Sequence, residues 1–232
     1  MSEPVSRNLT ILLTDIKGFT DRTSHQSRAE IQQFLDHHKQ VVLPVLVGKG
    51  GTLVKTMGDA FLMTYESPTN AVLAGIQVQD ALAAYNLGKP ADQRIDVRVA
   101  INQGEVNIVD NDVFGEAVNI TARIEAVADA GDVFFTEAIY LAMNKKEVPS
   151  SEVGLLQLKG IPEKVRVYRV KRETPVKSLE GAPVVVIPRT PAAPPPAAPL
   201  AASPAGTGAR GASPWAIASV AVVLVGAVGL FA

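Results

Sequence analysis

The chain has 232 residues, which is enough for one domain with its own core and additional segments. Its formal net charge of -1 provides no electrostatic attraction for nucleic acid, so we expect no nucleic-acid partner. The absence of cysteine excludes disulfides, thiolate nucleophiles and thiolate metal sites.

Strand and helix patterns alternate through the first 173 residues. In chain order, they predict a strand over 9–15, a helix over 28–50, a hairpin over 52–65, a helix over 68–88, two strands within 96–110 hinged near Gly104, a short helix from about residue 115, a strand over 131–136, a helix over 137–143 and two strands within 153–170. Helices that recur between strands in a small domain indicate an α/β or α+β fold with a βαββαβ core.

The composition changes after residue 173. Residues 174–214 are rich in Pro, Ala and Gly and poor in aromatic residues, which predicts an extended linker. Residues 215–232 are uncharged, and as a helix they span about 27 Å, close to the hydrocarbon thickness of a bilayer. We therefore expect a C-terminal transmembrane helix, with Trp215 at the interface and the domain of residues 1–173 in the cytoplasm.

Two carboxylates end predicted elements that lie side by side in a βαββ arrangement. Asp15 ends the first strand, and Asp59 occupies the turn of the hairpin. Each has an ordinary explanation, because aspartate caps helices and forms tight turns. Together they are a candidate site for a hard cation such as Mg²⁺, which proteins hold with one or two carboxylates and phosphate oxygens.

A second polar group lies around the short helix near residue 115. Asn119 and Arg123 are four residues apart and share a helix face, and Asp112 precedes them in the adjoining loop or strand. A solvated polar stripe would explain the same spacing.

Three motifs together resemble those of class III nucleotidyl cyclases. LLTDIKGFT, VKTMGDAFL and DVFGEAVNITARI occur in the family's order and with its internal spacing, and LQLKGIPEKVRVYRV is similar to the usual end of that domain. The resemblance covers about residues 7–170 and implies an α+β fold with a ferredoxin-like βαββαβ core. It also implies an adenylate cyclase, which converts ATP to 3′,5′-cyclic AMP and pyrophosphate with two Mg²⁺ or Mn²⁺ ions per site.

The resemblance assigns roles to particular residues. Asp15 and Asp59 correspond to the metal carboxylates, and the Ile16 carbonyl to an additional metal ligand. Lys55 and Asp112 correspond to the pair that selects adenine. The remaining implied roles are those of Asn119 in positioning the ribose, Arg123 in stabilising the transition state and Lys159 in contacting the terminal phosphates.

The position of Lys55 in the hairpin raises a question about its partner. If Lys55 paired with Asp59, it would compete with the metal for that carboxylate. In the resembled family, one domain supplies the metal carboxylates of a site and a second domain supplies the other groups. Since this chain carries both sets, we expect a symmetric homodimer with two shared sites.

Other functions remain open. A guanylate cyclase is the nearest alternative enzyme, although Lys55 and Asp112 favour adenine. A diguanylate cyclase is disfavoured because the chain has no Gly-Gly-Asp-Glu-Phe segment. A catalytically inactive nucleotide-binding or dimerisation module would be expected to lack a metal or transition-state residue, and none is missing.

Overall fold

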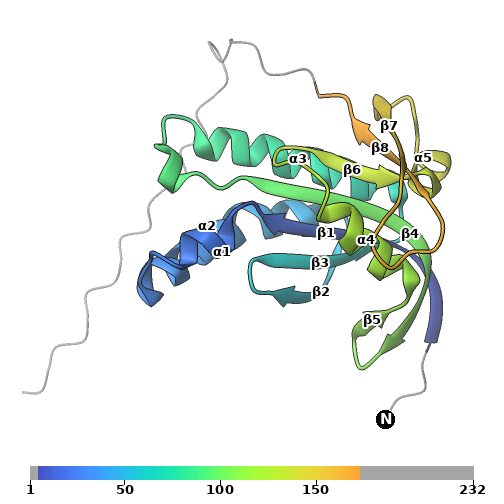
Figure 1. The fold of residues 1–232 in the computed structure, drawn as a ribbon, viewed down its shortest axis with the longest axis horizontal. Coiled ribbons are helices and arrows are strands. Elements are labelled where there is room, and N and C mark those ends of the chain that lie inside the picture. Colours follow the sequence, from blue (N-terminus) through green and yellow to red (C-terminus); the bar gives the residue numbers. More distant parts are fainter. Residues whose placement is uncertain (1–4, 173–232) are drawn as a thin grey trace, which may run out of the picture. The chain divides into compact units, whose positions relative to one another are not determined.

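The computed structural model describes residues 5–172 (Figure 1). The predicted linker (174–214) and C-terminal helix (215–232) lie outside these residues, so both stay predictions. Within residues 5–172, no helix combines the length and the apolar composition needed to cross a membrane.

One mixed sheet organises the domain. Its strands are β1 (Val5–Ile16), β2 (Thr52–Met57), β3 (Ala60–Tyr65), β4 (Val97–Val109), β5 (Asp112–Phe114), β6 (Val133–Thr136), β7 (Ser150–Leu156) and β8 (Val165–Val170). The order is β2-β3-β1-β4-β6-β8-β7, and β5 pairs with β4. The first four strands thus have the ferredoxin-like order, and the predicted α+β class and βαββαβ core are confirmed.

The helices lie on both faces of this sheet (Figure 1). They are α1 (Phe19–Thr23), α2 (Arg28–Gly48), α3 (Pro68–Asn86), the 3-10 turn η1 (Ala91–Gln93), α4 (Glu116–Glu125) and α5 (Glu137–Ala142). Helices α2 and α3 pack on the face of β1 that carries Leu12 and Ile16. Helix α4 packs on the opposite face, against Leu9, Ile11 and Leu13.

Local sequence explains where several of these elements begin and turn. Ser27 caps α2, since its hydroxyl accepts from the Glu30 N–H while the Glu30 carboxylate accepts from the Ser27 N–H. In the β2–β3 turn, Gly58 has φ 64°, which is a left-handed conformation that glycine adopts without strain. The predicted hairpin is confirmed, and its turn presents Asp59 at the end of the sheet.

The prediction of two strands hinged near Gly104 is wrong. Strand β4 is continuous from Val97 to Val109, and the chain turns only before β5. Gly104 instead lies under α4, where an added Cβ would come 3.0 Å from the Ala117 Cβ. Glycine at this position therefore permits close packing between the strand and the helix.

Candidate active site

The two predicted metal carboxylates meet where β1 leaves the sheet. A hollow of about 130 Å³ is lined by both Asp15 and Asp59, together with Ile16 and the start of α1. The Ile16 N–H donates to Asp59 Oδ2 at 3.0 Å, which fixes the orientation of that carboxylate. Strand pairing between β1 and β3 therefore brings together residues that are 44 positions apart.

Two charged residues at this site were not predicted from the sequence. Arg98 lies directly opposite Asp15 in the β1–β4 register, and its Nη2 forms an ion pair with Asp15 Oδ2. The Arg98 Nε also lies 2.8 Å from Oε1 of Glu125, the last residue of α4. From the sequence pattern alone, an arginine within an alternating strand is expected to face solvent. Arg98 could have been assigned to the site only if the register between β1 and β4 had been known.

The charges at this end of the sheet favour a bound cation. Three carboxylates, from Asp15, Asp59 and Glu125, surround the single guanidinium of Arg98. Burial, and then the charge of Asp15, raises the pKa of Asp59. The same two causes raise the pKa of Glu125 to about 7. Uncompensated negative charge in a partly buried hollow is what a divalent cation relieves.

The ligand set fits a cation that shares its coordination with a substrate. Within residues 5–172, no three His, Asp or Glu side chains are grouped around one metal position. Asp15 and Asp59 line the same hollow, and two carboxylates suit Mg²⁺ or Mn²⁺ whose coordination is completed by phosphate oxygens and water.

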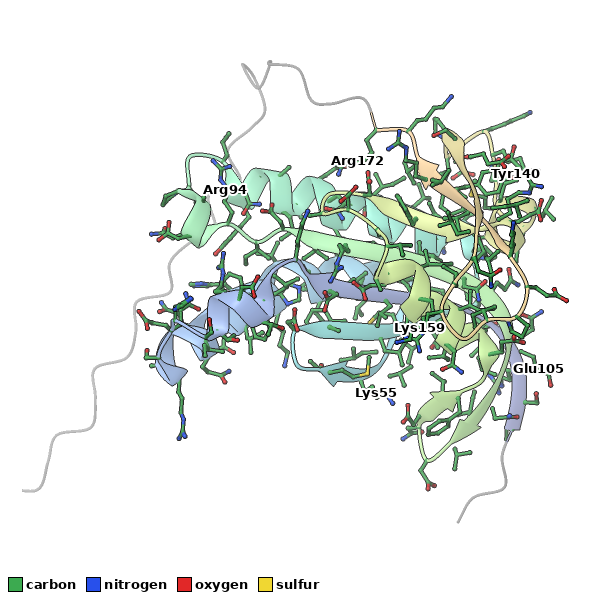
Figure 2. The ribbon with its side chains drawn as sticks, in the orientation of Figure 1. Lys55, Arg94, Glu105, Tyr140, Lys159 and Arg172 are labelled. Atoms are coloured by element: carbon green, nitrogen blue, oxygen red, sulfur yellow. The ribbon has the colours of Figure 1, made fainter. Side chains whose placement is uncertain are left out.

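Lys55 does not pair with Asp59. Its Nζ lies 2.6 Å from Asp112 Oδ2, and this contact joins β2 to β5 across 57 residues. Figure 2 labels Lys55 on the β2–β3 hairpin. This hydrogen bond lowers the pKa of Asp112, so the carboxylate is ionised and acts only as an acceptor at neutral pH. The structure thus pairs the two residues implied to select adenine, and Lys55 makes no ion pair with either predicted metal carboxylate within the described residues.

The remaining three predicted residues lie on or beside the outer face of α4. Asn119 and Arg123 are both exposed on this helix. The Arg123 Nε donates to the Lys159 carbonyl at 2.9 Å, which places the β7–β8 loop against the helix (Figure 2). In the described part of the chain, no side-chain hydrogen bond or ion pair links this group to Asp15 or Asp59.

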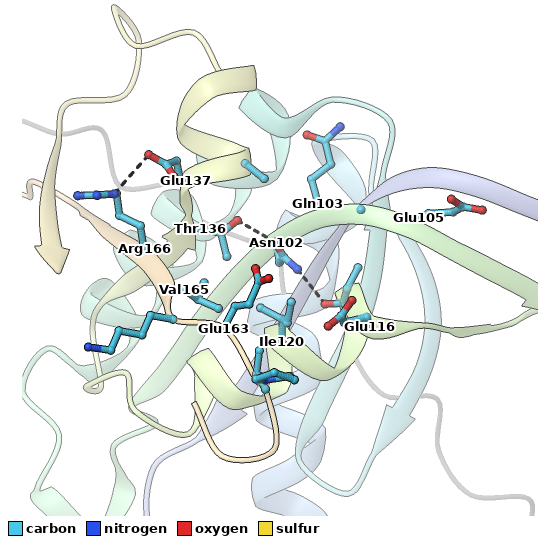
Figure 3. Close-up of a pocket in the computed structure, with 16 residues that line it drawn as sticks. Asn102, Gln103, Glu105, Glu116, Ile120, Thr136, Glu137, Glu163, Val165 and Arg166 are labelled. Carbon is cyan, nitrogen blue, oxygen red and sulfur yellow. Dashed lines mark hydrogen bonds and ion pairs between the residues drawn. The ribbon is translucent and has the colours of Figure 1, made fainter. Parts of the chain in front are cut away.

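A buried polar network fixes α4 on the sheet. Asn102 donates to the Ala117 carbonyl at 3.1 Å and accepts from the Thr136 hydroxyl at 2.8 Å (Figure 3). These residues line a cavity of about 620 Å³ between α4, α5 and the β7–β8 loop. None of the eight residues predicted for the site lines this cavity. The hydrogen bonds of Asn102 beside it fix α4, the helix that carries Asn119 and Arg123.

Comparison with known proteins identifies the family of the domain. The sequence profile of the adenylate and guanylate cyclase catalytic domain matches residues 1–172. A crystal structure described as an adenylate/guanylate cyclase/hydrolase from Silicibacter pomeroyi superposes with a TM-score of 0.66 at 25% identity. That match covers 74% of this chain and 100% of the other.

Two curated proteins match over the same region. The serine/threonine-protein kinase pkn2 of Myxococcus xanthus is 40% identical over 166 residues, which are 72% of this chain and 20% of that protein. The putative adenylate cyclase 3 of Rhizobium meliloti (strain 1021) is 30% identical over 168 residues, 72% of this chain and 29% of that protein. The chain thus spans less than a third of either relative, and it belongs to the family of adenylate and guanylate cyclase catalytic domains.

Proposed function

We propose that the protein is an adenylate cyclase, which converts ATP to 3′,5′-cyclic AMP and pyrophosphate. The reaction takes place at sites that are shared between two copies of the chain. Each site holds two Mg²⁺ or Mn²⁺ ions. The relative from Rhizobium meliloti is named as a putative adenylate cyclase, which favours the same substrate.

The observation that carries the choice of base is the Lys55–Asp112 pair, with its 2.6 Å contact. Adenine presents an acceptor at N1 and donors at its 6-amino group, which match a lysine donor and a carboxylate acceptor. Guanine presents O6 as an acceptor and N1–H as a donor, so both side chains would face the wrong partner. A buried mismatch of this kind costs roughly 1–3 kcal/mol per group.

The other residues act on the ribose and the phosphates. Asp15, Asp59 and the Ile16 carbonyl would hold the metal ions. When bound, these ions would lower the pKa of the ribose 3′-hydroxyl and offset charge on the attacking and leaving oxygens. Asn119 orients the ribose, Arg123 stabilises negative charge that grows at the α-phosphate, and Lys159 contacts the terminal phosphates.

A homodimer follows from the separation of the two groups of residues. Asn119 and Arg123 are exposed on α4 and the Lys159 loop lies against that helix, whereas Asp59 accepts from the Ile16 N–H at the end of β1. We infer that the outer group of one copy completes the metal site of its partner. Two copies related by a two-fold axis then contain two complete sites.

Membrane attachment is part of the proposal and rests on the apolar run of residues 215–232. It would place residues 1–173 in the cytoplasm, where ATP is available, and hold two copies in one membrane plane. Confinement of this kind raises their effective concentration.

The direct test is product formation by the purified full chain. ATP or GTP is incubated with Mg²⁺ or Mn²⁺, and cyclic AMP and cyclic GMP are quantified. We expect cyclic AMP from ATP, and its loss in Asp59→Ala but not in Asp92→Ala, an exposed carboxylate of η1. Predominant cyclic GMP would reject the base assignment, and no cyclic product from folded protein would reject the enzyme.

A further inference from the structure

Arg98 occupies the position of a counterion beside the predicted metal carboxylates. Its side chain is 23% exposed and lies between Asp15, at 24%, and Glu125, at 13%. The contact with Asp15 joins directly opposed residues of β1 and β4, whereas the contact with Glu125 joins the sheet to the end of α4. One guanidinium therefore bridges two carboxylates from different elements.

The two contacts differ in quality. Arg98 Nη2 forms a hydrogen-bonded ion pair with Asp15 Oδ2. The contact with Glu125 is close at 2.8 Å, but the Nε–H does not point at the carboxylate, and neither atom makes another hydrogen bond. The Glu125 carboxyl also lies close to Asp15, whose charge contributes to its raised pKa. Its Oε1 is nevertheless a preformed partner for Arg98 that makes no hydrogen bond within the described residues.

A divalent cation at Asp15 and Asp59 would repel the adjacent guanidinium, because like charges at short range in a partly buried site are costly. Arg98 must then give up Asp15 or weaken metal binding. Without a second carboxylate within reach, the displaced guanidinium would be left partly buried and unpaired, which carries a desolvation penalty.

We propose that Glu125 is a positioning residue that holds Arg98 when a metal ion takes over Asp15. This inference rests on the metal site of the proposed function. It gives Glu125, at the end of α4, a role in the metal site, whereas Asn119 and Arg123 are proposed to act on the nucleotide. Glu125 follows Arg123 by two residues, or about 200° of helical rotation, so the two side chains leave α4 on different sides. One helix then contacts the metal site of its own chain through Glu125 and offers Arg123 to the partner.

The test measures metal binding directly rather than turnover. The full chain in detergent is titrated with Mn²⁺, and free Mn²⁺ is followed by electron paramagnetic resonance. We expect Glu125→Gln to raise the Mn²⁺ Kd about tenfold, equivalent to roughly 1.4 kcal/mol. Glu116→Gln is the matched control, because it makes the same side-chain change at an exposed position at the other end of α4.

A shorter side chain separates positioning from simple charge. Glu125→Asp keeps the negative charge but withdraws it from Arg98, so we expect a weakening similar to that of Glu125→Gln. In an Arg98→Met background, no guanidinium needs to be held, and Glu125→Asp is expected to have no further effect. Unchanged thermal unfolding temperatures in the absence of metal would exclude a merely structural role.

Three results would overturn the proposal. The first is an unchanged Mn²⁺ Kd in Glu125→Gln. The second is a wild-type Mn²⁺ Kd in Glu125→Asp while Glu125→Gln binds Mn²⁺ more weakly. The third is an effect of Glu125→Asp on the Mn²⁺ Kd that is the same with and without Arg98. Tight Mn²⁺ binding without cyclic nucleotide formation would reject the proposed cyclase activity but would not contradict the role of Glu125. Failure of the wild type to bind Mn²⁺ would remove the metal site and this inference together.

Discussion

Lys55 illustrates how a partner can position a single side chain for its proposed role in base recognition. Asp112 holds the lysine at 2.6 Å, yet an ammonium has three donors and a carboxylate has four acceptor sites. The pair can therefore remain in contact while each member turns a free donor or acceptor toward a base. A base that presented the opposite pattern of donors and acceptors would leave both groups mismatched, which is the source of the proposed discrimination.

Reversal of these donor and acceptor roles should relax the choice of nucleotide. Lys55→Glu accepts from the guanine N1–H and Asp112→Ser donates to O6, so we expect the ratio of kcat/KM for ATP over GTP to fall on the order of 100-fold. Initial rates of cyclic AMP and cyclic GMP formation give this ratio, with Glu116→Gln as the control. An unchanged ratio in the folded double variant would remove both residues from base recognition.

His38 is a second residue whose surroundings decide its chemistry. It is 1% exposed on α2, stacks on Phe61 with ring centroids 4.8 Å apart, and has no hydrogen-bond partner for Nε2. Burial lowers the pKa of His38 to about 4. Phe61 follows Asp59 by two residues, so a charge on His38 would disturb the core directly behind the carboxylates.

The lowered pKa of His38 predicts a loss of folding stability in acid. The unfolded chain binds the His38 proton near pH 6.5 and the folded chain only near pH 4, so stability is full above pH 6.5 and declines toward pH 4. Between pH 8 and pH 5, this group should remove about 2 kcal/mol of the free energy of unfolding. Urea denaturation should show a smaller acid loss in His38→Leu; equal losses in both proteins would contradict the assignment.

At the scale of elements, α4 carries residues with two different proposed roles. It carries Asn119, Arg123 and Glu125. The hydrogen bonds of Asn102 fix the helix on the sheet, and the absence of a side chain at Gly104 permits their close contact. Because Gly104 has no Cβ, the start of α4 can approach β4 closely at Ala117, while the end of the helix contacts the sheet through Glu125 and Arg98. The position of α4 therefore controls several functional groups together.

A side chain at this contact should displace the helix. Gly104→Val forces a Cβ to within 3.0 Å of the Ala117 Cβ, and overpacking of this kind costs about 1–3 kcal/mol. We expect a lower urea midpoint and a larger fractional loss of cyclic AMP formation. Gly48→Ala is the control, because an added Cβ there meets no atom within 4 Å. Full activity in Gly104→Val would show that the seating of α4 is not critical.

At the scale of the whole molecule, the proposed sites are completed between two copies, which complementation can test. Asp15→Ala removes the metal side of a site and Arg123→Ala removes the transition-state side, so each homodimer should be inactive. A mixed dimer retains one intact site, and equal mixing should restore about a quarter of wild-type activity, because half of the dimers are mixed. No recovery from two folded chains that co-assemble would reject shared sites.

The C-terminal run makes a separate prediction about the whole chain. The full protein should float with phospholipid vesicles in a density gradient, since residues 215–232 match the thickness of a bilayer. Val222→Arg combined with Leu224→Arg should abolish flotation, because each buried charge costs about 2.5–3.5 kcal/mol at the centre of a membrane helix. Flotation of the arginine variant would show that another part of the chain binds the lipid.

The sequence by itself determined features that depend on neighbours along the chain. Helical spacing predicted α2, α3, α4 and α5, and the Gly58 turn predicted the β2–β3 hairpin, because periodicity and turn chemistry act over a few residues. Spacing within three motifs also indicated the residues proposed for metal, base and phosphate. The hinge expected at Gly104 was wrong for the same reason, since glycine within a strand signals either a bend or a close contact.

Tertiary structure alone decided the partners of the charged side chains. Arg98 meets Asp15 across 83 residues through the β1–β4 register. Lys55 meets Asp112 across 57 residues although β2 and β5 do not pair, so that contact depends on how the fold places two separate strands. Register is set by the packing of a whole sheet against its helices, so a local pattern cannot specify it. The chain's motifs therefore carried the chemistry, while the fold decided which charges compensate one another.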